Sequence, residues 1–186
     1  MQPQQRQTLL RVAREVIEAV VQGQSPPQHE SSEPIFAEHR GCFVTIKNRG
    51  RLRGCIGTFV AEAPLLRSVE QMAQAATRDP RFPLDPITPE ELGQIDIEIS
   101  VLSPLKKTDD PLSLELGKHG IYIRRGLNTG CFLPRVATET GWNKEEFLSH
   151  CCAGKAGLEP DAWKDPDTEV LLFTAEILSE SEETGP

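Results

Sequence analysis

The chain has 186 residues, of which 38% are apolar and 26% charged, and its formal net charge is -8 at pH 7. This composition is that of an ordinary globular protein, so we expect one domain, with room for two lobes. The negative charge disfavours non-specific binding to nucleic acid. No apolar run approaches the roughly 20 residues that span a bilayer, and the N-terminus does not have the pattern of a leader peptide, so we expect a cytoplasmic protein.

The first third of the chain is expected to contain one helix and one hairpin. Apolar residues at helical spacing predict an amphipathic helix from Gln4 to Gln22. The stretch from Gln24 to Pro34, rich in proline and serine, is typical of a surface loop. Alternation from Cys42 to Lys47, followed by Asn48-Arg49-Gly50, indicates a hairpin whose second strand runs from Arg51 to Phe59.

The middle of the chain alternates between helical and extended patterns. A helix opened by Pro64 should continue to Ala76, and the segment from Thr77 to Pro83 is punctuated by proline as in a rigid loop. Thr88 to Glu91 has the form of a capping box, which predicts a short helix. Strict alternation from Ile95 to Val101 predicts a strand with one buried face.

The remaining third predicts a second hairpin, a helix and a final strand. The hairpin pairs Ile121 to Arg125 with Cys131 to Leu133, and Asn143 followed by Glu146 caps the helix. Val170 to Ile177 is expected to be a single strand, and 179–186 a loose tail. Hairpins interspersed with helices favour an α+β class with a largely antiparallel sheet.

Five cysteines make an odd number in a chain large enough to be stabilised by packing, so we expect free thiols. The four histidines are scattered, and no pair of cysteines has metal-ligand spacing. We therefore expect no metal and no cofactor.

Cys55 is the thiol with the strongest indication of chemistry. In a regular strand it shares a face with Arg51 and Arg53, and a guanidinium beside a thiol in a partly buried site favours the nucleophilic thiolate. We predict Cys55 as a nucleophile and Arg53 as the residue that binds an anionic group. Gly54 and Gly57 fit either a close approach to a ligand or a β-bulge without function, and glycine placement alone leaves both open.

The segment Leu52-Arg53-Gly54-Cys55-Ile56-Gly57-Thr58 resembles the signature of the AMMECR domain family in its bacterial and archaeal form, AmmeMemoRadiSam system protein A. Further blocks carry the resemblance over nearly the whole chain: 76–82, 97–102, 119–121, 133–134 with 136–137, 141–142, and 155–158 with Trp163. The resemblance implies flanking helices, a smaller lobe, and a cleft beside the signature, where Gly54, Gly57 and Thr58 would contact a ligand. It also implies an association with a Memo-like protein and a radical SAM protein.

Other residues are weaker candidates. Glu98 can orient Arg53 or act as a base, although an ion pair is the commoner role of such a carboxylate. His119 would complement Cys55 as a base, but a hydrogen-bonded structural histidine is commoner. Asp79, Arg81 and Phe82 form either a ligand-binding loop or a turn closed by an Asp79–Arg81 contact.

Two classes of function fit these patterns. The first is an enzyme, or a site that binds a small anionic molecule or modified nucleobase, with Cys55 and Arg53 at its centre. The second is a non-catalytic module that recognises protein or RNA through the same residues, and the acidic net charge lowers the RNA version. A nucleophile without an assured general base does not decide between them.

Overall fold

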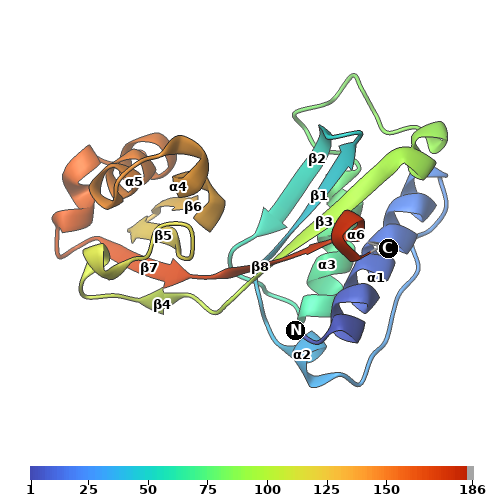
Figure 1. Ribbon diagram of the computed structural model, residues 1–186, viewed down its shortest axis with the longest axis horizontal. Helices are drawn as coiled ribbons and strands as arrows, with labels where there is room; N and C mark the ends of the chain where they lie inside the picture. The colour runs from blue at the N-terminus through green and yellow to red at the C-terminus, as the bar shows by residue number, and fades with distance from the viewer. Residues whose placement is uncertain (184–186) are drawn as a thin grey trace. The chain divides into compact units, whose positions relative to one another are not determined.

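The computed structural model describes residues 1–183 and divides the chain into two compact units (Figure 1). The first unit comprises Met1–Leu102 with the C-terminal segment from Glu176, and the second comprises Ser103–Ala175. Each contains a four-stranded sheet with antiparallel pairing. The predicted α+β class with antiparallel strands is therefore confirmed, although the strands form two sheets.

The first unit packs helices against the sheet of order β2-β1-β3-β8, and α1 and α3 contact both each other and the strands (Figure 1). Its elements in chain order are α1 (Pro3–Val21), α2 (Pro34–Ala37), β1 (Cys42–Asn48), β2 (Arg51–Thr58), α3 (Leu65–Ala76), the 3-10 helix η1 (Pro89–Gln94), β3 (Ile95–Leu102), β8 (Ala175–Ser179) and α6 (Glu180–Glu183).

Alternation along the strands builds the core of the first unit. Val44 of β1 pairs with Ile99 of β3, and Ile46 pairs with Ile97. All four side chains are fully buried in the cluster that includes the apolar faces of α1 and α3. Burial of each such side chain contributes roughly 1.5–3 kcal/mol, so this cluster fixes the register of β1 on β3.

Strand β2 contains an irregularity that changes where its side chains point. Ile46 pairs with Gly54, but the next residue, Lys47, pairs with Leu52, so Arg53 has no partner in β1. An extra residue in one strand breaks the alternation of faces. Leu52 and Cys55 therefore lie on the same face and Arg51 lies on the other, so the prediction that Arg51 shares the face of Cys55 is wrong. Arg53 is the extra residue, and its side chain bonds Glu91 and Asp85 instead of lying beside the thiol as predicted.

The segment 24–33 contains no helix or strand, and Pro34, the last residue of the predicted loop, begins α2. His29 nevertheless connects this loop to two helices through side-chain contacts. Nδ1 of His29 lies 2.9 Å from a carboxylate oxygen of Glu70 on α3, and Nε2 lies 2.7 Å from one of Glu15 on α1. His29 therefore joins the loop to both helices, and Glu33 adds a contact by accepting from Nε2 of Gln5 on α1.

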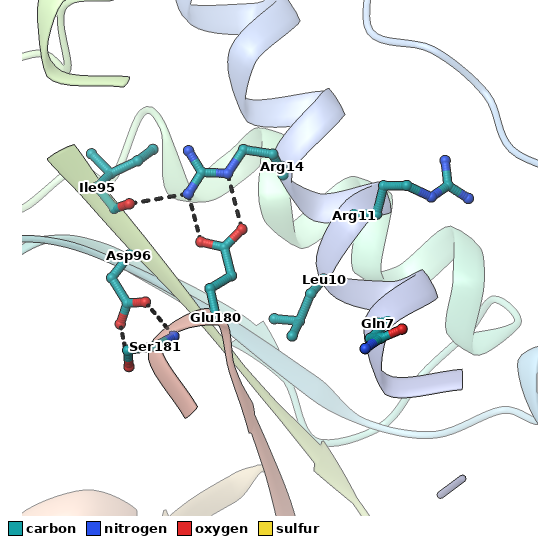
Figure 2. Close-up of a pocket in the computed structure, with 8 residues that line it drawn as sticks. All are labelled: Gln7, Leu10, Arg11, Arg14, Ile95, Asp96, Glu180 and Ser181. Carbon is teal, nitrogen blue, oxygen red and sulfur yellow. Dashed lines mark hydrogen bonds and ion pairs between the residues drawn. The ribbon is translucent and has the colours of Figure 1, made fainter. Parts of the chain in front are cut away.

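The prediction of a loose tail is wrong for its first residues, which are held in place by side-chain contacts. These contacts lie in a groove of about 550 Å³ along α1, β3 and α6 (Figure 2). Arg14 donates from Nε and Nη2 to the two carboxylate oxygens of Glu180, at 2.9 and 2.5 Å. The backbone N–H of Ile97 donates to Glu180, and that of Ser181 donates to Asp96. Residues 179–183 end β8 and form α6, and 184–186 lie outside the described residues.

The second unit packs its helices on a sheet of order β4-β7-β5-β6 (Figure 1). Its elements are β4 (Lys106–Lys107), the 3-10 helix η2 (Pro111–Ser113), β5 (Gly120–Arg125), β6 (Asn128–Phe132), α4 (Pro134–Thr140), α5 (Lys144–Cys151), the π-helix η3 (Cys152–Ala156), the 3-10 helix η4 (Pro160–Lys164) and β7 (Glu169–Phe173). Asn143 and Glu146 cap α5 reciprocally, as predicted.

The predicted strand from Val170 to Ile177 is in fact two strands in two sheets. β7 ends at Phe173 and β8 begins at Ala175. Between them, the N–H of Thr174 donates to the hydroxyl of Ser103, and its carbonyl accepts from the N–H of Ser103. An uninterrupted apolar run does not reveal such a change of partner, because both halves bury apolar side chains.

Candidate functional site

Cys55 lies in the middle of β2, directly opposite Thr45 of β1. The Thr45 hydroxyl donates to Cys55 Sγ at 3.2 Å, and the N–H of Cys55 donates to Asp79 Oδ2 at 2.9 Å. The carbonyl of Cys55 accepts from Nη2 of Arg81 at 3.0 Å. Cys55 is half-buried, so these bonds position a thiol that solvent can still reach.

The turn formed by Asp79, Pro80 and Arg81 supplies the charges beside Cys55. The buried Asp79 carboxylate accepts from the N–H, Nε and Nη2 of Arg81, the last at 2.6 Å. Arg81, followed by the N–H of Cys55, holds the pKa of Asp79 at about 2 against the cost of burial. The expected Asp79–Arg81 contact is therefore present, and it bonds directly to the backbone of Cys55.

Arg81 is bonded along one edge only. Asp79 chiefly raises the pKa of Arg81, and Cys55, whose carbonyl accepts a hydrogen bond from the guanidinium, adds a smaller contribution. The Arg81 side chain is 56% exposed, and its Nη1 donates to no described residue. The guanidinium lies 5.8 Å over the ring of Phe82. Its open edge is available to a carboxylate or phosphate.

Arg53 occupies a different environment from the one predicted. It is only 4% exposed and bonds both carboxylate oxygens of Glu91 at 3.0 Å, Asp85 at 2.7 Å and the carbonyl of Pro86 at 3.1 Å. No hydrogen bond or ion pair among the described residues joins it to Cys55. The bulge directs Arg53 to the segment before β3, where its three nitrogens are all engaged. Arg53 is therefore a structural anchor.

Glu91 and Asp85 were missed as partners of Arg53. Glu91 was recognisable only as the third residue of the capping box, in which it also accepts the N–H of Thr88 at 2.9 Å. Arg53 is the main cause that lowers the pKa of Glu91 to about 2. The sequence carries a signal for the cap but none for the contact with a strand 38 positions away.

Both glycines of the signature permit close packing within the first unit. A Cβ on Gly54 would overlap the carbonyl of Ala76 at the end of α3, and one on Gly57 would overlap the ring of Phe43. Thr58 donates its hydroxyl to the carbonyl of Val60, 2.7 Å away. These contacts explain the three residues without a ligand, and their predicted role in binding stays a prediction.

Glu98 forms an ion pair, as favoured, but with Lys47 at 2.9 Å rather than with Arg53. It pairs across the strands with Thr45, which in turn pairs with Cys55, so the three residues form one cross-strand row.

His119 belongs to the second unit, where its Nδ1 accepts the N–H of Glu115 at 3.0 Å. The roles of Glu98 and His119 as bases stay predictions.

The other four thiols are less suited to nucleophilic chemistry. Burial raises the pKa of Cys42 to about 12 and that of Cys131 to about 11, and it also raises the pKa values of Cys151 and Cys152. Thiolates at these positions are scarce at neutral pH. None of the five cysteines forms a disulfide, and the described part of the chain gathers no three metal-ligating side chains.

Comparisons with known proteins cover nearly the same residues. The AMMECR1 family model matches residues 10–178. A protein of Methanopyrus kandleri is 44% identical over 188 residues, covering 96% of this chain and 89% of the relative. One of Methanothermobacter thermautotrophicus is 43% identical over 181 residues and covers 93% of each chain. The names of both relatives state no activity.

A solved structure extends the similarity to the fold. The crystal structure of an uncharacterized protein from Pyrococcus horikoshii matches with a TM-score of 0.81 and 37% sequence identity, covering 96% of this chain and 93% of that chain. In 1–183, no helix has the length and apolar character needed to cross a membrane. The family match spans most of the chain and both units, and the chain therefore belongs to the AMMECR1 family.

Proposed function

We propose that Cys55 and Arg81 form a site that binds or modifies a small anionic molecule or a modified nucleobase. The observation that supports this proposal is the bonded set of Cys55, Asp79 and Arg81, which holds a half-buried thiol beside a guanidinium with one open edge. A planar guanidinium binds carboxylate and phosphate through two parallel hydrogen bonds. The proposal therefore transfers the anion-binding role from Arg53 to Arg81.

Each neighbour of Cys55 has a distinct part in the proposed site. Asp79 positions the Cys55 backbone and the Arg81 side chain together, since it accepts hydrogen bonds from both. The Thr45 hydroxyl stabilises negative charge on Sγ by donating to it. Glu98, in the same cross-strand row, is the nearest candidate for a proton acceptor on these strands.

The association with a Memo-like protein and a radical SAM protein enters the proposal from the family resemblance alone. A ligand shared by the three proteins would be a substrate or product of a common pathway. The alternative of non-catalytic recognition uses the same residues, and it differs in one respect: the thiol would then be dispensable for binding.

The first experiment ranks the thiols. The full chain is treated with limiting iodoacetamide at neutral pH, and the labelled peptides are mapped by mass spectrometry. We expect Cys55 to react first, because the pKa values of the other four thiols are raised by burial. Faster labelling of Cys131, the other half-buried thiol, would contradict the proposal.

The second experiment searches for the ligand directly. Protein recovered from cells under native conditions is analysed for small molecules that leave with it on denaturation. We expect an anionic compound with the wild type and with Arg78→Gln, a change at an exposed arginine of the same turn, but not with Arg81→Gln. If Cys55→Ser retains the same compound as the wild type, the site binds the compound without reacting with it. If Arg81→Gln retains as much compound as the wild type, Arg81 is not part of the binding site.

A further inference from the structure

A pocket of about 430 Å³ lies wholly within the second unit and uses none of the residues around Cys55. Its walls come from the segment before β4, from β4 itself, from the residue before β5 and from the end of β7. The residues that matter for its chemistry are Ser103, Lys106, Lys107, His119, Leu172 and Phe173. A volume near the lower end of the usual range, ~300–1,000 Å³, suits a small ligand.

Two side chains that line the pocket, those of His119 and Lys106, supply hydrogen-bond donors. Nδ1 of His119 accepts the N–H of Glu115 at 3.0 Å, so the neutral ring carries its proton on Nε2. Nε2 is therefore a donor whether the ring is neutral or protonated. It bonds to no residue in the described part of the chain, which leaves this donor to a ligand.

Lys106 provides a positive charge that the protein does not neutralise. Its neighbour Lys107 pairs with Glu169 at 3.3 Å, whereas Lys106 has no ion pair or side-chain hydrogen bond with any residue of 1–183. No aspartate or glutamate lies among the described residues that line the pocket. A mobile ammonium and a fixed imidazole N–H in the lining of one pocket thus favour an anion.

The apolar part of the lining comes from β7, where Leu172 is the cross-strand partner of Lys106. Phe173 is almost completely buried, and Leu172 packs partly into the core of the unit. Gly120 pairs with Phe173, and a Cβ on Gly120 would overlap the Phe173 ring, so the glycine next to His119 makes room for that ring. The pocket therefore combines an apolar wall with two donors, as expected for a ligand that is itself amphipathic.

We propose that this pocket binds a small organic anion, in which a phosphate or carboxylate group bonds Lys106 and His119 while an apolar part packs on Leu172. The site is independent of Cys55, so a ligand can bind in this pocket whether or not Cys55 takes part in a reaction. It also gives His119 a role within its own unit.

The test titrates the full chain, observed by amide nuclear magnetic resonance, with phenyl phosphate, benzoate, inorganic phosphate and phenol. We expect saturable shifts of the Ser103, Thr108 and Thr174 amides with at least one of the two organic anions, and at least about tenfold weaker binding of inorganic phosphate and phenol. Tighter binding of phenyl phosphate identifies a phosphate ligand, and tighter binding of benzoate a carboxylate. No saturable shift with either organic anion overturns the proposal.

Matched variants separate the site from general charge effects. Lys106→Gln should weaken binding about tenfold or more, since a charge-assisted hydrogen bond is lost. His119→Asn, whose amide oxygen can still accept the Glu115 N–H, should weaken it similarly because the Nε2 donor is gone. Lys118→Gln removes an exposed lysine of the same unit that pairs with Glu115, and it should leave binding unchanged. Equal losses in Lys118→Gln and Lys106→Gln would disprove the site, and Cys55→Ser should bind like the wild type.

Discussion

Arg53 of β2 and Arg81, which bonds to the backbone of β2, differ in exposure and in how many of their donors are engaged. Arg53 is 4% exposed and bonds two carboxylates and a carbonyl with all three nitrogens. Arg81 is 56% exposed and bonds Asp79 and the Cys55 carbonyl with two of its three nitrogens. The difference shows that an arginine is a candidate for ligand binding when some of its N–H donors have no partner within the protein. Being close to a cysteine in the sequence is not sufficient.

The largest expected effect concerns stability at Arg53. Arg53→Met should lower the free energy of unfolding by about 3 kcal/mol, because Glu91 would remain partly buried without its partner. Arg51→Met is the matched control, since Arg51 pairs with the same Asp85 but is 70% exposed, and it should cost less than about 1 kcal/mol. Urea unfolding measures both, and equal costs would mean that Arg53 does not anchor β2.

The next prediction concerns acid, where the carboxylates bonded to these two arginines should behave alike. The pKa values of Glu91 and Asp79 are held at about 2, chiefly by Arg53 and Arg81 respectively. A carboxyl group whose pKa is lower in the folded state stabilises the fold above its unfolded pKa, and this contribution is lost as the pH falls through the folded value.

We therefore expect each of these two pairs to lose about 2 kcal/mol of stability between pH 4.5 and pH 2. Glu91→Gln and Asp79→Asn should each be less stable than the wild type at pH 7, and each should show a shallower fall in acid. Unfolding curves at a series of pH values test this. A fall as steep in both variants as in the wild type would show that other carboxylates cause the acid loss.

The fold was largely predictable because its patterns are local. Alternation located β1, β2 and β3, and the capping box of Asn143 and Glu146 located the start of α5. What could not be predicted depends on long-range contacts. Gly54 was compatible with a β-bulge, but the sequence did not place the register shift at Ile46/Lys47 that leaves Arg53 without a partner in β1.

The candidate site was predictable in its parts but not in its assembly. Cys55, Asp79 and Arg81 were each candidates, yet the Asp79 carboxylate that joins them contacts a residue 24 positions away. Because side-chain pairing across such distances depends on the packed fold, sequence patterns assigned the guanidinium to Arg53. The contact between the C-terminal Glu180 and Arg14 was missed for the same reason.

A smaller effect should distinguish the two arginines by their influence on the thiol. Arg81→Gln should slow alkylation of Cys55 about threefold, equal to about 0.7 kcal/mol, because an exposed guanidinium favours the thiolate only modestly. Arg78→Gln should leave the rate unchanged. Arg53→Met, assayed where it remains folded, should also leave it unchanged, and a larger effect at Arg53 than at Arg81 would reverse the comparison.

The smallest expected effect is that of Cys55→Ser on stability. Serine keeps a hydrogen-bonding group opposite the Thr45 hydroxyl, and the backbone bonds to Asp79 and Arg81 do not involve the side chain of residue 55. The variant should therefore lie within about 0.5 kcal/mol of the wild type, as is usual for substitutions that bury no unsatisfied group. Cys42→Ser is the contrasting change: Cys42 is fully buried in the apolar core, so a hydroxyl there should cost about 2 kcal/mol. If Cys55→Ser cost as much as Cys42→Ser, Cys55 would be a packing residue, and the proposed site would have no accessible thiol.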